Sequence, residues 1–122
     1  GADFAFETTL SGKSNLRLIK RLRYEGWDVE LIYLALPSVD MCKRRVAERV
    51  AHGGHDIPVS DIERRFFRSL SNLFRAYTKA VTRTRCFMNQ FKPPKIVFEN
   101  CDGKLVVEDS MYFELLNRMK QI

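Results

Sequence analysis

Two arginines four residues apart, Arg45 and Arg49, have the clearest chemical potential in this sequence. In a helix, that spacing places both guanidinium groups on one face. Guanidinium groups bind phosphate and carboxylate oxygens in bidentate geometry, and they neutralise the charge that develops on the oxygens during phosphoryl transfer. The alternative is a solvated helix face on which these arginines form ion pairs with Glu48 or Asp61.

The surrounding segment is strongly basic. Residues 41–85 contain eleven Lys or Arg and four Asp or Glu, a balance of +7, whereas the remaining residues have ten bases and eleven acids. Nine of the eleven bases are arginines. A basic middle third in an otherwise neutral chain predicts an anionic ligand there, either a polyphosphate or a nucleic acid.

A second motif, Ser11-Gly12-Lys13-Ser14, resembles the end of a Walker A loop, GxxxxGK[ST], and lies between a predicted strand and a predicted helix. The first glycine of that motif lets the backbone bend closely around a phosphate. Glu7 occupies that position here, and its carboxylate would repel the phosphate. We therefore expect a helix-entry loop and not a working phosphate-binding loop.

The elements that must position these residues follow from hydrophobic periodicity and turn residues. We expect strands at 3–8, 29–36, 85–88, 95–99 and 105–108, and helices at 14–25, 38–52, 60–81 and 110–120. The run Cys101-Asp102-Gly103 predicts a turn before the last strand. The apolar run that follows Glu30 is typical of a strand covered on both faces in a parallel sheet. The sequence thus predicts a single α/β domain over residues 1–122, with a helical lid region.

Local signals define the predicted helix ends. Ser38 is the expected N-cap of the helix at 38–52, and Gly53-Gly54 end that helix. Ser60-Asp61-Ile62-Glu63 has the spacing of a capping box for the next helix. Residues 53–58 between them have the composition of a mobile lid, with His55 either a ligand contact or a structural residue.

Composition limits the class of protein. A chain of 122 residues that is 45% hydrophobic and 30% charged is typical of one globular domain. The sequence has no apolar run of membrane-spanning length and no leader-like N-terminus. Its three cysteines, Cys42, Cys86 and Cys101, form no CxxC pair, which indicates reduced thiols in a cytoplasmic protein and no metal held by protein side chains alone.

Three ordered blocks resemble one known family, the zeta-toxin-like P-loop kinases, in their C-terminal half. The blocks are 4–12 (FAFETTLSG), 45–58 (RVAERV followed by GGHDIP) and 62–73 (IERRF followed by SL and NL). The resemblance extends from Phe4 to about Asn89. Lys13 replaces the arginine that is frequent after LSG in the family, and the family's aromatic-Asp-Asn tract is retained only as Asn89.

The resemblance implies ATP-dependent phosphoryl transfer with Mg²⁺, on the parallel sheet of a P-loop NTPase. The family's toxin members phosphorylate UDP-N-acetylglucosamine. The family's Walker A loop and catalytic-base Asp precede the first block and are absent from these residues, so we expect the chain alone to be inactive.

The resemblance also implies roles for individual residues. Substrate binding is expected for Glu7, Thr8, Thr9, Ser11 and His55. Catalytic roles are expected for Arg45, Arg49 and Arg65, and nucleotide binding for Arg45, Arg49 and Arg64. The three hydroxyl residues could equally cap the following helix. Of Arg64 and Arg65, we expect one to be functional and the other solvated.

Other functions remain open at the level of sequence. The arginine-rich segment is compatible with a non-catalytic nucleic-acid-binding domain, although no recognisable RNA- or DNA-binding motif is present. A protein-interaction domain derived from a kinase that lost its P-loop, pairing as a dimer, is a further possibility. The family resemblance separately allows an antitoxin as partner. The apolar strands at 3–8 and 29–36 also predict self-association through an exposed sheet edge.

Overall fold

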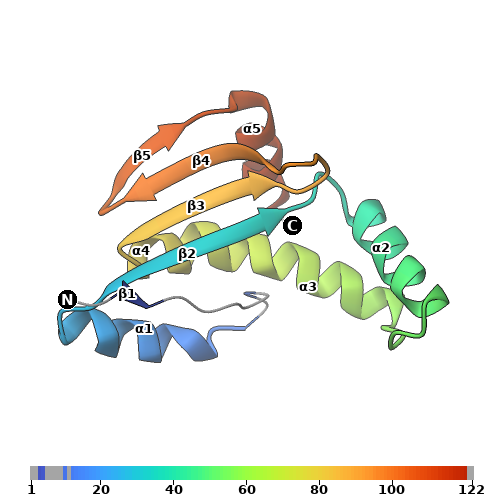
Figure 1. The fold of residues 1–122 in the computed structure, drawn as a ribbon, viewed down its shortest axis with the longest axis horizontal. Helices are drawn as coiled ribbons and strands as arrows, with labels where there is room; N and C mark the ends of the chain where they lie inside the picture. The colour runs from blue at the N-terminus through green and yellow to red at the C-terminus, as the bar shows by residue number, and fades with distance from the viewer. Residues whose placement is uncertain (1–2, 5–9, 11, 121–122) are drawn as a thin grey trace.

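A computed structural model describes residues 3–4, 10 and 12–120. Within them, the helices are arranged around one sheet (Figure 1). The elements in chain order are β1 (Asp3–Phe4), α1 (Ser14–Tyr24), β2 (Asp28–Ala35), α2 (Val39–Ala51), α3 (Val59–Asn72), the π-helix η1 (Leu73–Tyr77), α4 (Thr78–Ala80), β3 (Arg83–Met88), β4 (Lys95–Cys101), β5 (Lys104–Val107) and α5 (Ser110–Met119). The prediction of an α/β fold is confirmed.

The sheet is mixed, with the strand order β1-β2-β3-β4-β5. β1, β2 and β3 are parallel, whereas β3, β4 and β5 are antiparallel. The expected parallel sheet is therefore present only in the first three strands. The physical reason is the length of the last two connections, since a parallel crossover needs about a dozen or more residues. Only residues 89–94 join β3 to β4, and only Asp102 and Gly103 join β4 to β5.

The β4–β5 hairpin follows directly from its turn residues. Both Asp102 (φ 49°) and Gly103 (φ 84°) have left-handed backbone conformations. Two consecutive residues of this kind make the tight turn whose twist matches the twist of paired strands, and Asp-Gly is a favoured sequence for it. The turn predicted at these residues is confirmed.

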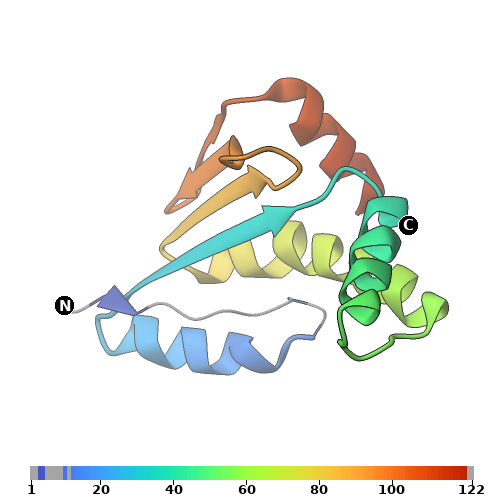
Figure 2. The same cartoon turned by 45° about the vertical axis from the view of Figure 1, so that its right-hand side comes forward.

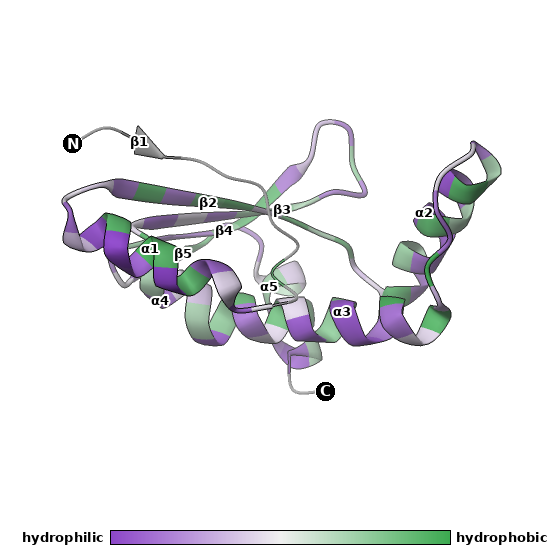
Figure 3. Ribbon diagram, turned by 90° about the horizontal axis from the view of Figure 1, so that it is seen from below, coloured by the Kyte–Doolittle hydropathy of each residue, from purple (hydrophilic) through white to green (hydrophobic). Residues whose placement is uncertain are grey.

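The helices α1, α3, α4 and α5 lie on one side of the sheet (Figure 3). The core lies between the sheet and these helices. Its buried side chains come from the strands and from the helices, among them Val29, Cys86, Phe98, Leu73 and Leu116. The opposite side of β2 exposes Ile32 (53%) and Leu34 (54%). The prediction that β2 is covered on both faces is wrong for the described part of the chain, because no described helix packs on that side.

The start of α3 differs from its prediction. The helix begins at Val59, since the carbonyl of Pro58 accepts hydrogen bonds from the backbone N–H groups of Asp61 (2.9 Å) and Ile62 (3.1 Å). Ser60 is therefore inside the first turn and makes no cap. The fixed φ of Pro58 presets this earlier start. The predicted capping box is wrong, whereas Ser38 does cap α2, with its Oγ accepting from the N–H of Met41 at 3.2 Å.

Helix α2 stands beyond the carboxyl end of β2, next to the first turns of α3 (Figures 1 and 2). A hydrogen bond caps the C-terminus of α2: the N–H of Gly54 donates to the carbonyl of Arg49 at 2.7 Å. A Cβ atom at Gly54 would lie 2.8 Å from that same carbonyl oxygen, so only glycine fits this cap. The two glycines thus end α2 as predicted.

Candidate functional site

The parallel strands β2 and β3 end side by side, and a basic side chain joins their ends. The N–H of Asn89, just after β3, donates to the carbonyl of Ala35 at the end of β2 (2.8 Å). Arg45 Nη2, on α2, donates to the carbonyl of Asn89 at 2.7 Å. In open α/β sheets, ligands bind beyond the carboxyl ends of parallel strands. Arg45 therefore lies where this rule places a ligand.

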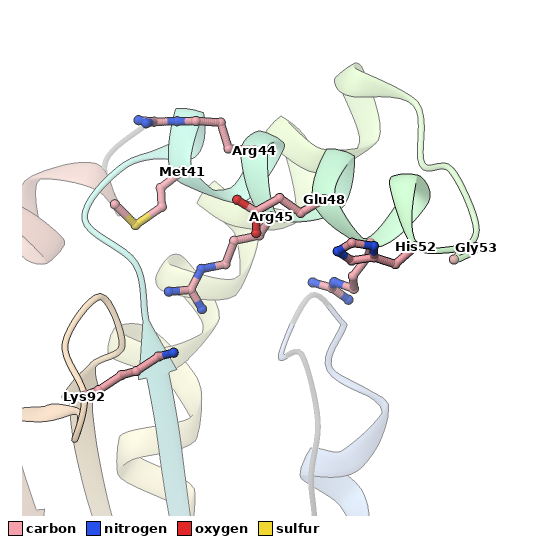
Figure 4. A pocket seen from close by; sticks show the side chains of 9 residues that line it. Met41, Arg44, Arg45, Glu48, His52, Gly53 and Lys92 are labelled. Atoms are coloured by element: carbon pink, nitrogen blue, oxygen red, sulfur yellow. The ribbon is translucent and has the colours of Figure 1, made fainter.

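A cavity of about 960 Å³ opens next to Arg45, and we call it the basic cavity. Its lining comes from α2, the residues that end α2, and the β3–β4 connection: Met41, Arg44, Arg45, Glu48, Arg49, His52, Gly53, Gly54 and Lys92. The side chains of Arg45 and Lys92 extend into one space from opposite elements, whereas Arg44 extends away from it (Figure 4). Four cationic side chains and one carboxylate line the cavity, which favours an anionic ligand.

A second cavity of about 710 Å³, the apolar cavity, lies between β2, α2 and α3. Its walls are mainly aliphatic and aromatic, but Arg49 and Arg65 contribute to them. Arg49 lines both cavities. This guanidinium group is therefore placed to contact a ligand that has an anionic part in the basic cavity and a less polar part in the apolar cavity.

The Cys42 thiol reports the electrostatics of this region. Partial burial raises its pKa, and the positive charges of Arg45 and Arg49 act in the opposite direction. Deeper in the apolar cavity, the Tyr33 hydroxyl is 2.6 Å from Ser69 Oγ. Burial raises the pKa of Tyr33, so this hydroxyl is neutral and serves as a hydrogen-bonding group in the wall.

Ion pairing separates the bases of the middle segment into two groups. Four of the eleven are paired with carboxylates: Lys43 with Glu63, Arg64 with Asp61, Arg83 with Glu99 and Arg85 with Glu30. Among the described residues, none of the ion pairs includes Arg45 or Arg49. The alternative in which these two arginines pair with Glu48 or Asp61 is therefore wrong for this part of the chain. Their positive charge is available to a ligand.

The predicted site residues do not all come together. Arg45 lines the basic cavity, Arg65 lines the apolar cavity, and Arg49 lines both. Arg64 instead pairs with Asp61 at 3.1 Å and lines a separate depression on α3. His55 is exposed and lines neither cavity. The two adjacent arginines therefore lie at different places: Arg65 lines the apolar cavity, whereas Arg64 pairs with Asp61 outside it.

The predicted acceptor residues Glu7, Thr8, Thr9 and Ser11 lie outside the described residues. Their neighbours are held by the helices under the sheet: Asn72 Nδ2 donates to the carbonyl of Leu10 at 2.6 Å, and the Tyr77 hydroxyl donates to the carbonyl of Gly12 at 2.9 Å. Leu10 is fully buried and has a left-handed φ of 57°. Two side chains from α3 and η1 thus anchor the backbone next to these residues.

Sequence reasoning missed Lys92 and His52 as cavity residues. Lys92 reaches the basic cavity only because β2 and β3 are parallel neighbours, which brings residues 35 and 89 together. For His52, a local signal does exist in the sequence. Its position, three residues after Arg49 on the same helical path, is the signal that could have identified it.

No group of three His, Cys, Asp or Glu side chains within the described ranges could hold a metal ion. None of the helices in those ranges is long and apolar enough to cross a membrane.

Comparison with known proteins gives one partial match. An uncharacterized protein of Haemophilus influenzae is 33% identical over 63 residues. The match covers 52% of this chain and 45% of that protein, so the chain spans less than half of the relative's length. No family model and no solved structure matches the chain.

Proposed function

We propose that this chain is the acceptor and lid part of an ATP-dependent small-molecule kinase similar to the zeta-toxin-like P-loop kinases. The observation that carries the proposal is the position of Arg45 and Arg49. Both arginines line the basic cavity, at the carboxyl ends of parallel strands, and neither has a carboxylate partner among the described residues.

The chemistry of phosphoryl transfer fits such a cavity. Charge is spread over the transferring group and the leaving group, so catalysis depends on fixed positive charges in addition to positioning. Arg45 is held in place by the Asn89 carbonyl, which leaves its remaining N–H groups for an anion. Arg49 and Arg65 would contact the same ligand from the apolar cavity. The parallel arrangement of β1 to β3 is compatible with part of a P-loop sheet.

The cofactors of this reaction are ATP and Mg²⁺. The described side chains fit the phosphates and not the metal, because the residues that line the basic cavity include several cations and a single carboxylate. Mg²⁺ would therefore be bound mainly by nucleotide phosphates and by residues outside this segment. The acceptor would be a small molecule with a hydroxyl group, and a nucleotide sugar is one such class.

The experiment that tests the kinase proposal uses the complete polypeptide that the gene encodes. It is incubated with ATP, Mg²⁺ and a panel of hydroxyl acceptors that includes UDP-N-acetylglucosamine, and transfer is followed by ³¹P NMR. We expect transfer to at least one acceptor. Arg49→Ala should reduce the rate at least about a hundredfold, since a fixed charge at the reacting phosphate contributes several kcal/mol.

Arg75→Ala is the matched control, because Arg75 is exposed and lines neither cavity. It removes the same charge and should leave the rate within about twofold. The proposal is wrong if the complete polypeptide neither binds ATP nor transfers phosphate. Salt-sensitive binding of RNA or duplex DNA in place of ATP would instead identify a nucleic-acid-binding domain.

A further inference from the structure

Strand β5 is the outermost strand of the sheet on one side, within the described part of the chain (Figure 1). It exposes Leu105 (46%), Val106 (44%) and Val107 (38%). Natural proteins usually protect such an edge with charges, prolines or a covering element. Three consecutive exposed aliphatic residues on an edge strand therefore indicate a surface that pairs with another strand.

The hydrogen-bonding pattern between β4 and β5 shows which residues of β5 can pair with a further strand. Cys101 and Lys104 flank the two-residue turn, and the N–H of Glu108 donates to the carbonyl of Val97 at 2.9 Å. Hydrogen-bonded and non-hydrogen-bonded pairs alternate along an antiparallel ladder. The backbone groups of Lys104, Val106 and Glu108 therefore face β4. Those of Leu105 and Val107 face outward.

We propose that β5 pairs antiparallel with β5 of a second copy of this chain, about a two-fold axis at Val106. In this register, Leu105 of each copy lies opposite Val107 of the other. Each of these two pairs uses only outward-facing backbone groups, so the interface gains four main-chain hydrogen bonds. The two five-stranded sheets become one continuous sheet, and the contact is isologous, as in most homodimers.

Charge complementarity selects this register. Lys104 lies opposite Glu108 of the other copy, and the symmetry makes two such pairs. Both side chains are exposed, and neither forms an ion pair with a described residue of its own chain. They would occupy non-hydrogen-bonded positions, where cross-strand side chains approach most closely. A shift of the axis to Leu105 or Val107 would break both charge pairs.

Sedimentation velocity of the 122-residue chain, from micromolar to millimolar concentration, measures the association. We expect a reversible dimer. Lys104→Glu or Glu108→Lys places like charges opposite each other twice and should weaken the dimer about tenfold, given two cross-strand pairs that change sign. The double variant K104E/E108K restores opposite charges and should recover the affinity of the original chain. Lys20→Glu, an exposed change on α1, is the matched control and should have no effect.

Val107→Pro tests the backbone part of the interface. The N–H of Val107 faces outward, so proline removes a donor to the second copy without removing a β4–β5 hydrogen bond. We expect a folded monomer, with its circular dichroism spectrum unchanged. A chain that stays monomeric throughout the concentration range overturns the proposal. A dimer that survives both Lys104→Glu and Val107→Pro but dissociates with Ile32→Lys also overturns it, since the contact would then lie on the face of the sheet that exposes Ile32.

Discussion

Arg45 and Arg49 differ in how firmly the protein holds them. The guanidinium group of Arg45 is half-buried and donates to the Asn89 carbonyl, whereas Arg49 is exposed on the next turn of α2. A fixed cation provides a preorganised contact for a phosphate, and a mobile cation can follow the ligand. Both charges act on one neighbouring thiol, that of Cys42, which makes this thiol a useful reporter of the site.

The alkylation rate of Cys42 tests this electrostatic picture. Burial raises the pKa of the thiol, and Arg45 and Arg49 partly offset that effect. Below the pKa, the rate follows the thiolate fraction. Arg49→Ala should therefore slow alkylation by iodoacetamide at mildly alkaline pH, although it removes a bulky side chain from the cavity. Mass spectrometry measures the rate, with the exposed Cys101 as internal reference. Faster alkylation of Cys42 in the variant would contradict the account.

Asp109 gives the stability a defined pH dependence. Its carboxylate accepts a hydrogen bond from the N–H of Tyr112 (3.0 Å) at the start of α5 and pairs with Lys95 (3.1 Å). These contacts lower its pKa from the usual 3.8. A lowered folded-state pKa means that the stabilisation is complete above the unfolded-state pKa and is lost as the pH falls through the folded-state value.

Asp109→Asn keeps a good N-cap but removes the charge. Urea denaturation at neutral pH should show the variant to be less stable than the original chain, because the Lys95 pair is lost. As the pH is lowered below about 4, the difference between the two proteins should shrink. A difference that stays constant down to pH 2 would show that the charge of Asp109 does not contribute.

At the scale of elements, two serines near helix starts differ in their roles. Ser38 Oγ accepts from the N–H of Met41 and caps α2, whereas Ser60 lies inside the first turn of α3 and makes no cap. Ser38→Ala should lower the free energy of unfolding by about 0.5–2 kcal/mol, and Ser60→Ala should change it by less than about 0.5 kcal/mol. Urea denaturation of both variants measures these values. Equal losses would mean that α3 begins at Ser60 as the sequence motif predicts.

These elements also show what the sequence can predict. Local patterns were sufficient for the helix predicted at 14–25, the Ser38 cap and the Asp102-Gly103 turn, because each depends on residues close together in the sequence. The start of α3 was missed because two local signals compete there, Pro58 and the Ser60-to-Glu63 spacing. Lys92 was missed because its place depends on the pairing of β2 with β3, which are about fifty residues apart in the sequence.

At the scale of the whole molecule, the main departure from expectation is the face of the sheet that no described helix covers. An apolar run such as that in β2 looks the same in sequence whether one face or both are covered. The exposed Ile32 and Leu34 lie beside two ion pairs on β2–β4, Arg85 with Glu30 and Arg83 with Glu99. These pairs neutralise two arginines of the middle segment, whereas Arg45 and Arg49, which form no ion pair with a described residue, line the cavities.

The central claim is that the basic cavity binds phosphate groups through Arg45 and Arg49. Calorimetric titration of the chain with tripolyphosphate tests it most directly, because the test needs neither the acceptor nor the catalytic step. We predict saturable binding at one site, weakened about tenfold to a hundredfold by Arg45→Ala or Arg49→Ala and by less than about twofold by Arg75→Ala. No binding, or equal losses in all three variants, would contradict the assignment of this cavity.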